Sequence, residues 1–75
     1  MNSYEIHVRS RHQAQELYEL LTECTSDADL LQDDTRVDGR SLLGIYALDF
    51  ARPVTLEAYG ATDRLQERLE AFMEG

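Results

Sequence analysis

The 75-residue sequence contains no lysine and no tryptophan, and only one cysteine and one proline. A single cysteine, Cys24, excludes an internal disulfide and is typical of proteins in a reducing compartment. The longest apolar stretch, residues 42–48, is far shorter than the roughly 20 residues that span a bilayer. Met1 leads directly into a strand-like alternation, without a cationic and apolar leader. We therefore expect a cytoplasmic protein without a membrane segment.

Positive charge is also scarce, since seven arginines stand against fifteen carboxylate side chains, and the formal net charge is −8. Such a surface would repel a nucleic acid or an anionic membrane, so neither is expected as a partner. The length is that of one small domain, residues 1–75, and 43% hydrophobic residues predict a folded core of modest extent.

The first third of the chain has the pattern of a strand followed by a helix. In "SYEIHVRS", apolar and polar side chains alternate, which predicts a strand with one buried face over about residues 3–9. Ser10 is a suitable N-cap for a helix over 11–24. The apolar stripe of that helix consists of Ala14, Leu17, Tyr18, Leu21 and Cys24.

The middle of the chain mixes turn formers with short apolar pieces. We place a strand over 28–32, a turn over 33–35 and a brief strand around residues 36 and 37. The pair Asp38-Gly39 ends that strand, and Ser41 then caps a two-turn helix over 41–48.

The last third predicts one more strand and one more helix. Pro53 suits the first position of a strand over 54–59, which Gly60 ends. Thr62 caps a final helix whose stripe is Leu65, Leu69, Phe72 and Met73.

The predicted order is βαββαβα, an α+β fold. Three helices on one face of a four-stranded antiparallel sheet would form an open-faced two-layer sandwich, in which every apolar stripe is covered. The other face of the sheet, with Glu5, His7, Thr55 and Glu57, would be wet.

The segment "VDGRSLLGIYALDFARPVTLEAYG" resembles HPr, the histidine-containing phosphocarrier of the bacterial sugar phosphotransferase system. The family has a βαββαβα fold whose middle carries a Lys/Arg-Ser-apolar-apolar-Gly-apolar element, and residues 40–45 match it. Likeness at the residue level is confined to about residues 36–65. The resemblance implies a protein that is not itself an enzyme and is at most phosphorylated by one.

The resemblance breaks at the phosphorylation loop. Family members carry a Gly-Ile-His-Ala-Arg-Pro-like stretch there, whereas this chain has "VRSRHQAQEL". His12 falls within a residue of the phosphorylated histidine, but Ala14 and Gln15 replace the arginine and the proline. A phosphohistidine needs helix N–H groups and a guanidinium, which Arg9 or Arg11 could supply. His12 is therefore a candidate phospho-acceptor, and a solvated histidine in a first helical turn is the alternative interpretation.

Ser41 has two compatible interpretations. As an N-cap, its hydroxyl is worth about 1 kcal/mol relative to alanine. The equivalent serine in some HPr proteins is a kinase target, so the resemblance makes Ser41 a candidate for regulatory phosphorylation.

The helix after Ser41 is the candidate partner-binding site. Gly44 costs about 1 kcal/mol relative to alanine inside a helix, which indicates that the backbone approaches its support closely there. Leu42, Leu43 and Tyr46 would then point away and form an apolar docking patch. The resemblance implies protein partners, such as phosphotransferase enzymes or a transcriptional regulator. Alternatively, a loop at 50–52 or a second copy of the chain covers the patch.

No metal site, cofactor site or catalytic motif is predicted. The aspartates at 27, 29, 33 and 34 lack EF-hand spacing, because Leu31 and Gln32 stand where an oxygen ligand and a glycine belong. We expect an HPr-like domain with a degenerate phosphohistidine loop, which acts as a protein-binding or regulatory module, as a monomer or weak homodimer. The alternatives are a working phosphocarrier that uses His12 and a generic ferredoxin-like dimerising or ligand-binding module.

Overall fold

The structure, a computed structural model, describes residues 1–73 of the chain. The order of the elements is the predicted βαββαβα. None of the helices within residues 1–73 has the length and the apolar character needed to cross a membrane. In chain order the elements are β1 (Asn2–Ile6), α1 (Arg11–Cys24), β2 (Asp27–Gln32), β3 (Thr35–Asp38), α2 (Leu42–Tyr46), β4 (Val54–Tyr59) and α3 (Arg64–Met73).

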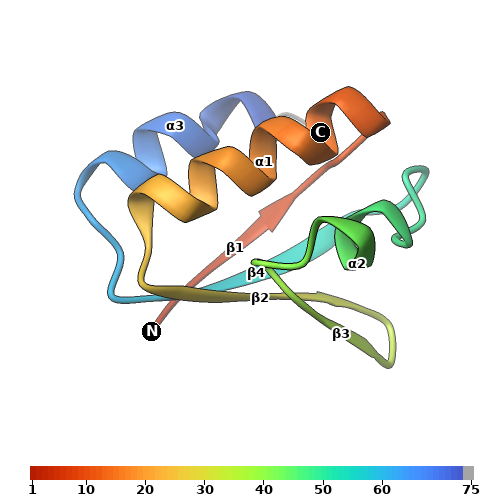
Figure 1. Cartoon of the computed structure of the whole chain (residues 1–75), viewed down its shortest axis with the longest axis horizontal. Helices are drawn as coiled ribbons and strands as arrows, with labels where there is room; N and C mark the ends of the chain where they lie inside the picture. The colour runs from red at the N-terminus through yellow and green to blue at the C-terminus, as the bar shows by residue number, and fades with distance from the viewer. Residues whose placement is uncertain (74–75) are drawn as a thin grey trace.

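The four strands form one antiparallel sheet in the order β1-β4-β2-β3. All three helices lie on one side of this sheet and the other side is bare, which confirms the predicted open-faced sandwich (Figure 1). On the bare side, Asp29 of β2 lies opposite Glu57 of β4. Arg36 of β3 donates to both carboxylates, at 2.7 and 3.2 Å, and this offsets their mutual repulsion.

The core fills the space between the sheet and the helices. In α1, Leu20 is buried and Tyr18 only half-buried, so the apolar stripe includes a residue that the prediction left out. In α3, Met73 is 39% exposed, and the predicted stripe therefore ends at Phe72. The largest fully buried side chains are Ile6, Val8, Leu17, Leu20, Cys24, Leu30, Ile45, Val54, Leu56, Leu65 and Leu69.

β1 is shorter than the strand predicted over 3–9. It ends at Ile6, and the backbone N–H of His7 donates to the carbonyl of Phe72 in α3 at 2.6 Å. Val8 is still buried beyond the end of the strand. The alternation of side chains therefore predicted burial correctly, whereas the change of backbone partner depends on where α3 packs.

Two further boundaries differ from the prediction. Thr35 was expected in the turn, but it pairs with Gln32 and opens β3. The last helix begins at Arg64, and the carbonyl of Thr62 accepts a hydrogen bond from the N–H of Leu65 at 3.1 Å. The chain thus makes a tight turn before the helix that Thr62 was expected to cap.

Candidate functional site

The first turn of α1 is capped by two side chains. The hydroxyl of Ser10 accepts from the N–H of Gln13 at 3.1 Å, and the side-chain oxygen of Gln13 accepts from the N–H of Arg9 at 2.8 Å. This arrangement is a variant of the capping box, whose serine and glutamine stand three residues apart. The letters "SRHQ" carry that signal, although only Ser10 was predicted as a cap. Because the N–H of Gln13 is already engaged, this helix start offers one donor fewer to a phosphoryl group.

His12 lies in this turn with 83% of its side chain exposed. Its Nε2 lies 3.6 Å from Oε1 of Glu16, one turn further along the helix. A carboxylate at this distance would repel the oxygens of a phosphoryl group on the same nitrogen. The imidazole is therefore accessible, and an acidic side chain lies beside it.

Arg11, one of the two predicted charge partners, makes its contact with α2. Its guanidinium lies over the ring of Tyr46, 4.5 Å from the ring centroid, in a cation–π arrangement. The contact joins the first turn of α1 to α2. Arg9, the other predicted partner, contributes its backbone N–H to the cap.

α2 contains five residues, Leu42–Tyr46, and is shorter than the helix predicted over 41–48. Ser41 is its N-cap, as predicted, and its hydroxyl accepts from the N–H of Gly44 at 3.1 Å. After Tyr46 the backbone tightens, and the N–H of Leu48 donates to the carbonyl of Ile45, three residues back. The predicted second turn is thus a turn of 3₁₀ type.

The inward face of α2 agrees with the prediction. A Cβ atom added to Gly44 would lie 2.6 Å from Cγ1 of Val37 in β3, so the helix backbone lies directly on that side chain. Ile45 is fully buried and Leu48 is 7% exposed. A residue with a Cβ atom here would force either Val37 or α2 to shift, and glycine avoids this contact.

The outward face differs from the prediction in part. Leu43 is 80% exposed, but Leu42 and Tyr46 are half-buried, and Tyr46 packs against the core. The prediction that all three side chains point away from the protein is therefore wrong for Tyr46. Phe50, in the loop after α2, is also half-buried against the core and leaves Leu43 open.

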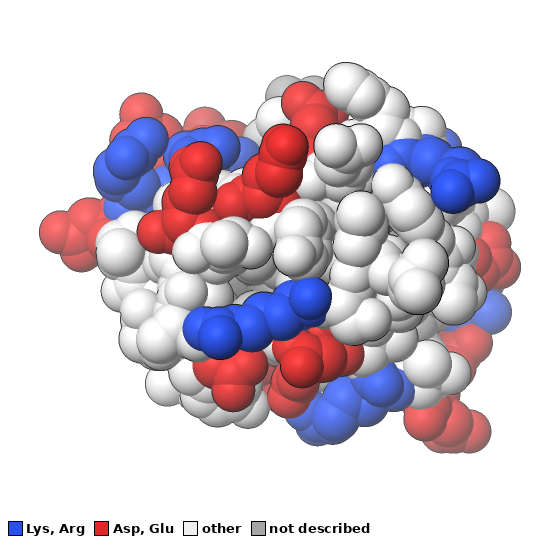
Figure 2. Space-filling model, in the orientation of Figure 1, with Lys and Arg blue, Asp and Glu red and all other residues white. Residues whose placement is uncertain are grey.

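We call the area formed by Leu42, Leu43, Tyr46 and the guanidinium of Arg11 the α2 surface. Figure 2 shows an uncharged region that extends over α2 and the start of α1, with arginines and carboxylates around its rim. On a chain with a net charge of −8, an uncharged area around an exposed leucine is a candidate contact surface.

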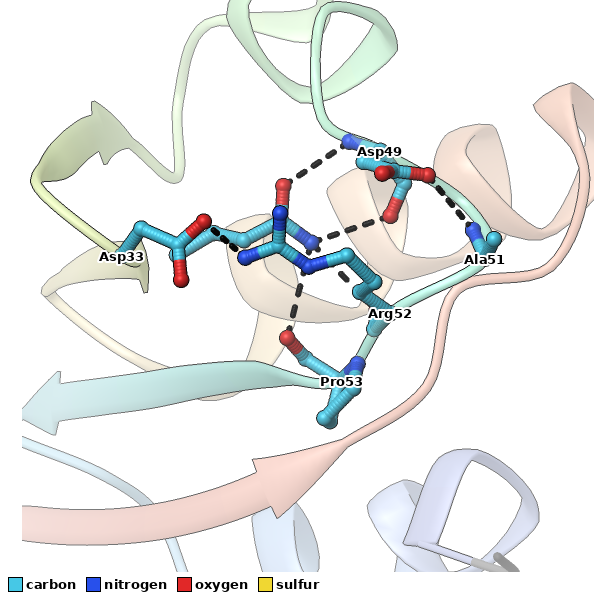
Figure 3. A network of polar contacts seen from close by, with 6 residues as sticks. Asp33, Asp49, Ala51, Arg52 and Pro53 are labelled. Carbon is cyan, nitrogen blue, oxygen red and sulfur yellow. Dashed lines mark hydrogen bonds and ion pairs between the residues drawn. The ribbon is translucent and has the colours of Figure 1, made fainter.

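The loop between α2 and β4 is held by a buried amide that sequence analysis did not identify as important. Gln32, 9% exposed at the end of β2, makes hydrogen bonds with the backbone of Asp49, Arg52 and Pro53. Arg52 also pairs with Asp33 in the turn after β2 (Figure 3). The signal was present, because the alternation in β2 puts Gln32 on the same inward face as Ala28 and Leu30.

Charged side chains elsewhere form pairs that support the fold. Arg68 of α3 donates to Glu23 of α1, and this hydrogen bond lowers the pKa of Glu23 and raises that of Arg68. The hydrogen bond to Asp29 likewise raises the pKa of Arg36.

Residues 1–73 enclose no pocket for a small molecule, and no three potential metal ligands among them lie together.

Comparison by sequence finds no matching family model and no matching curated protein. Comparison by structure finds the crystal structure of HPr-C-His from Thermoanaerobacter tengcongensis, with a TM-score of 0.69. The match covers 95% of this chain and 93% of that one, at 19% sequence identity. Identity at this level establishes a likeness of fold alone, and over almost its whole length this chain has the fold of HPr.

Proposed function

We propose that the chain is an HPr-like protein-binding or regulatory module with a degenerate phosphohistidine loop, and that it binds its partner through the α2 surface. The observation that carries this proposal is the exposure of Leu43, which presents 80% of an apolar side chain to solvent from a helix that is otherwise seated on the sheet. The HPr likeness points to phosphotransferase enzymes or a regulator as the class of partner.

The surroundings of His12 support a binding role more than a phosphocarrier role. A phosphohistidine is stabilised by a nearby guanidinium and by free helix N–H groups. Here Arg11 lies on Tyr46, the N–H of Gln13 is bonded to Ser10, and Glu16 lies beside the imidazole. Each of these contacts is unfavourable to a phosphoryl group on His12.

Ser41 lies at the edge of the α2 surface and is a candidate switch. Its hydroxyl already accepts a hydrogen bond from the N–H of Gly44. A phosphate at this position would add negative charge next to Leu42 and Leu43, where a partner would have to bury apolar surface. Phosphorylation of Ser41 is therefore proposed to weaken docking.

The binding proposal is tested with the general phosphotransferase enzyme as probe. Backbone amide signals of the isotope-labelled chain are followed by NMR while the unlabelled enzyme is added. We expect the signals of Leu42, Leu43 and Tyr46 to shift. Leu43→Glu should weaken binding at least about tenfold, because burial of a leucine is worth roughly 1.5–3 kcal/mol.

Ala71→Glu is the matched control, since Ala71 is an exposed residue of α3 and the substitution adds the same charge. It should leave binding unchanged. Shifts confined to another face, or equal weakening by both substitutions, would contradict the proposal. A tight homodimer in ultracentrifugation that Leu43→Glu dissolves would point instead to a dimerising module.

The second candidate function is that of a working phosphocarrier. It is favoured by the exposure of His12, whose imidazole is accessible to a phosphoryl donor. Incubation with phosphoenolpyruvate and the general phosphotransferase enzyme, followed by measurement of the intact mass, separates the two. We expect no adduct. An acid-labile phosphoryl adduct that His12→Ala abolishes would establish the phosphocarrier function. It would refute the proposal that the loop can no longer carry a phosphoryl group.

A further inference from the structure

The side chain of Gln32 holds both ends of the loop between α2 and β4. Its Oε1 accepts from the N–H of Asp49 at 2.8 Å, and the two N–H groups of its Nε2 are shared among the carbonyls of Asp49, Arg52 and Pro53, at 2.9, 3.3 and 3.4 Å. The orientation of the amide is determined by these partners, because a backbone N–H requires an acceptor and the carbonyls require a donor. A single buried side chain thus satisfies backbone groups on either side of the loop.

α2 depends on such outside contacts for its position. A helix of five residues is far below the length at which an isolated helix is stable in water. One contact lies at its middle, where Gly44 sits on Val37. Another lies just past its C-terminal turn, where the N–H of Asp49 reaches Gln32. Between these two points the helix carries Tyr46, whose ring packs on the core beneath Arg11.

We propose that Gln32 is a positioning residue for the α2 surface. Its amide fixes the loop at Asp49 and at Pro53. This sets the rotation of α2 about its own axis, and therefore the direction in which the side chains of Leu43 and Tyr46 point. The ordering of the loop is completed before a partner arrives, so that less conformational entropy is lost on docking. The docking role rests on the function proposed above, whereas the role of Gln32 in ordering the loop does not.

The nearby ion pair contributes less to this arrangement. Arg52 and Asp33 are joined across the same loop, but their side chains are 46% and 65% exposed. Exposed pairs of this kind contribute little, since water and salt screen them. Figure 3 shows the pair beside the backbone groups of Asp49 and Pro53, and Arg52→Gln is therefore a suitable control in the same loop.

The ordering role is tested by hydrogen exchange of backbone amides, expressed as protection relative to the unfolded chain. In Gln32→Met, the amides of Asp49 and Ala51 should lose at least about tenfold more protection than amides of α1, because the N–H of Asp49 loses its acceptor and the loop loses its link to β2. Arg52→Gln should leave the protection of Asp49 nearly unchanged. Equal loss of protection throughout the chain in Gln32→Met would overturn the ordering role.

The substitution Gln32→Glu tests whether residue 32 acts through its hydrogen bonds. If residue 32 only filled space, amide protection in this variant would not depend on pH. A protonated carboxyl group can donate to one carbonyl and accept from the N–H of Asp49, whereas the ionised group can only accept. The ionised group would therefore repel the carbonyl oxygens of Asp49, Arg52 and Pro53 and loosen the loop. Protection of Asp49 in this variant should recover as the pH falls and the group takes up a proton. Protection that does not depend on pH in Gln32→Glu would overturn the proposal.

The positioning role is tested by titration of each variant with the general phosphotransferase enzyme. Gln32→Met should weaken binding about tenfold, and Arg52→Gln should have little effect. Binding of Gln32→Met at the affinity of the unaltered chain, despite a loosened loop, would overturn the positioning role alone. Absence of binding by the unaltered chain would instead refute the proposed function, and the exchange measurements would still decide whether Gln32 orders the loop.

Discussion

At the scale of single residues, Gly44 decides how closely α2 approaches the sheet. A Cβ atom here would lie 2.6 Å from Cγ1 of Val37, a distance that van der Waals repulsion does not allow. Alanine is normally the better helix former by about 1 kcal/mol. The contact with Val37 reverses that preference, so this glycine is a consequence of packing and not of helix propensity.

We expect Gly44→Ala to destabilise the protein by roughly 1 kcal/mol. The estimate combines a cost of overpacking of about 1–3 kcal/mol with the gain in helix propensity. The melting temperature of a domain of this size should fall by roughly 4–8 °C. Thermal unfolding followed by circular dichroism measures the change.

Val37→Ala provides the control, because it removes the methyl group that the new Cβ would meet. In that background Gly44→Ala should be neutral or stabilising, and the double-mutant cycle should show a favourable coupling. Stabilisation by Gly44→Ala in the otherwise unaltered chain would refute the account of the close approach.

At the scale of elements, one charged pair joins the two long helices. Arg68 of α3 donates to Glu23 of α1, and this hydrogen bond is the main reason that the pKa of Glu23 is lowered from its ordinary value of 4.5. The charge of Arg68 acts in the same direction. A carboxyl group whose pKa is lower in the folded chain stabilises that chain at pH values above the unfolded pKa.

The contribution of Glu23 to stability should therefore depend on pH in a defined direction. It is complete above about pH 4.5, and it is lost as the pH falls through the lower folded pKa. Glu23→Gln should lower the urea midpoint slightly at pH 7, since the pair is exposed, and this difference should shrink in acid. Urea unfolding at several pH values between neutral and acid measures it.

Arg68→Gln is the control for this pair. In that background Glu23→Gln should have a much smaller further effect that depends on pH, because the hydrogen bond and the charge of Arg68 are absent and only the weaker attraction of Arg64 remains. A difference that grows in acid, in either background, would contradict the assigned cause of the lowered pKa.

At the scale of the whole molecule, the excess of carboxylates works against the folded state. Seven arginines against fifteen acidic side chains leave a formal net charge of −8 on a chain of 75 residues. Folding brings these charges closer together, and the resulting self-repulsion is screened by salt. The exposed ion pairs respond in the opposite direction, but each is worth little.

Sodium chloride should therefore stabilise the protein. We expect the midpoint of urea unfolding at pH 7 to rise as salt increases from about 20 mM to about 300 mM, over which range the Debye length becomes shorter than the protein. A midpoint that falls with added salt would mean that specific ion pairs outweigh the net repulsion.

Much of the fold could be predicted from the sequence, because hydrophobic periodicity is a local property. The stripe of α1 and the alternation in β1 and β4 identify faces that must be buried, and only a few arrangements cover them all. The ends of elements were less predictable. β1 ends where His7 bonds to Phe72, a residue that is remote along the chain.

The candidate site was predicted only in part for the same reason. Leu43 was correctly placed on the outside, since it lies opposite the glycine face of its helix. The half-buried position of Tyr46 depends on contacts with other elements, since its side chain packs against the core and Arg11 of α1 lies over its ring. The importance of Gln32 depends on carbonyl groups that are seventeen to twenty-one residues away.

The sequence by itself determined which faces are apolar, where α1 and α2 are capped and that α2 must lie close to its support, because these depend on neighbours within a few residues. The tertiary structure alone decided that Tyr46 is half-buried against the core and which backbone groups Gln32 satisfies. The physical reason is that packing and buried hydrogen bonds join residues that only the folded chain brings within contact distance.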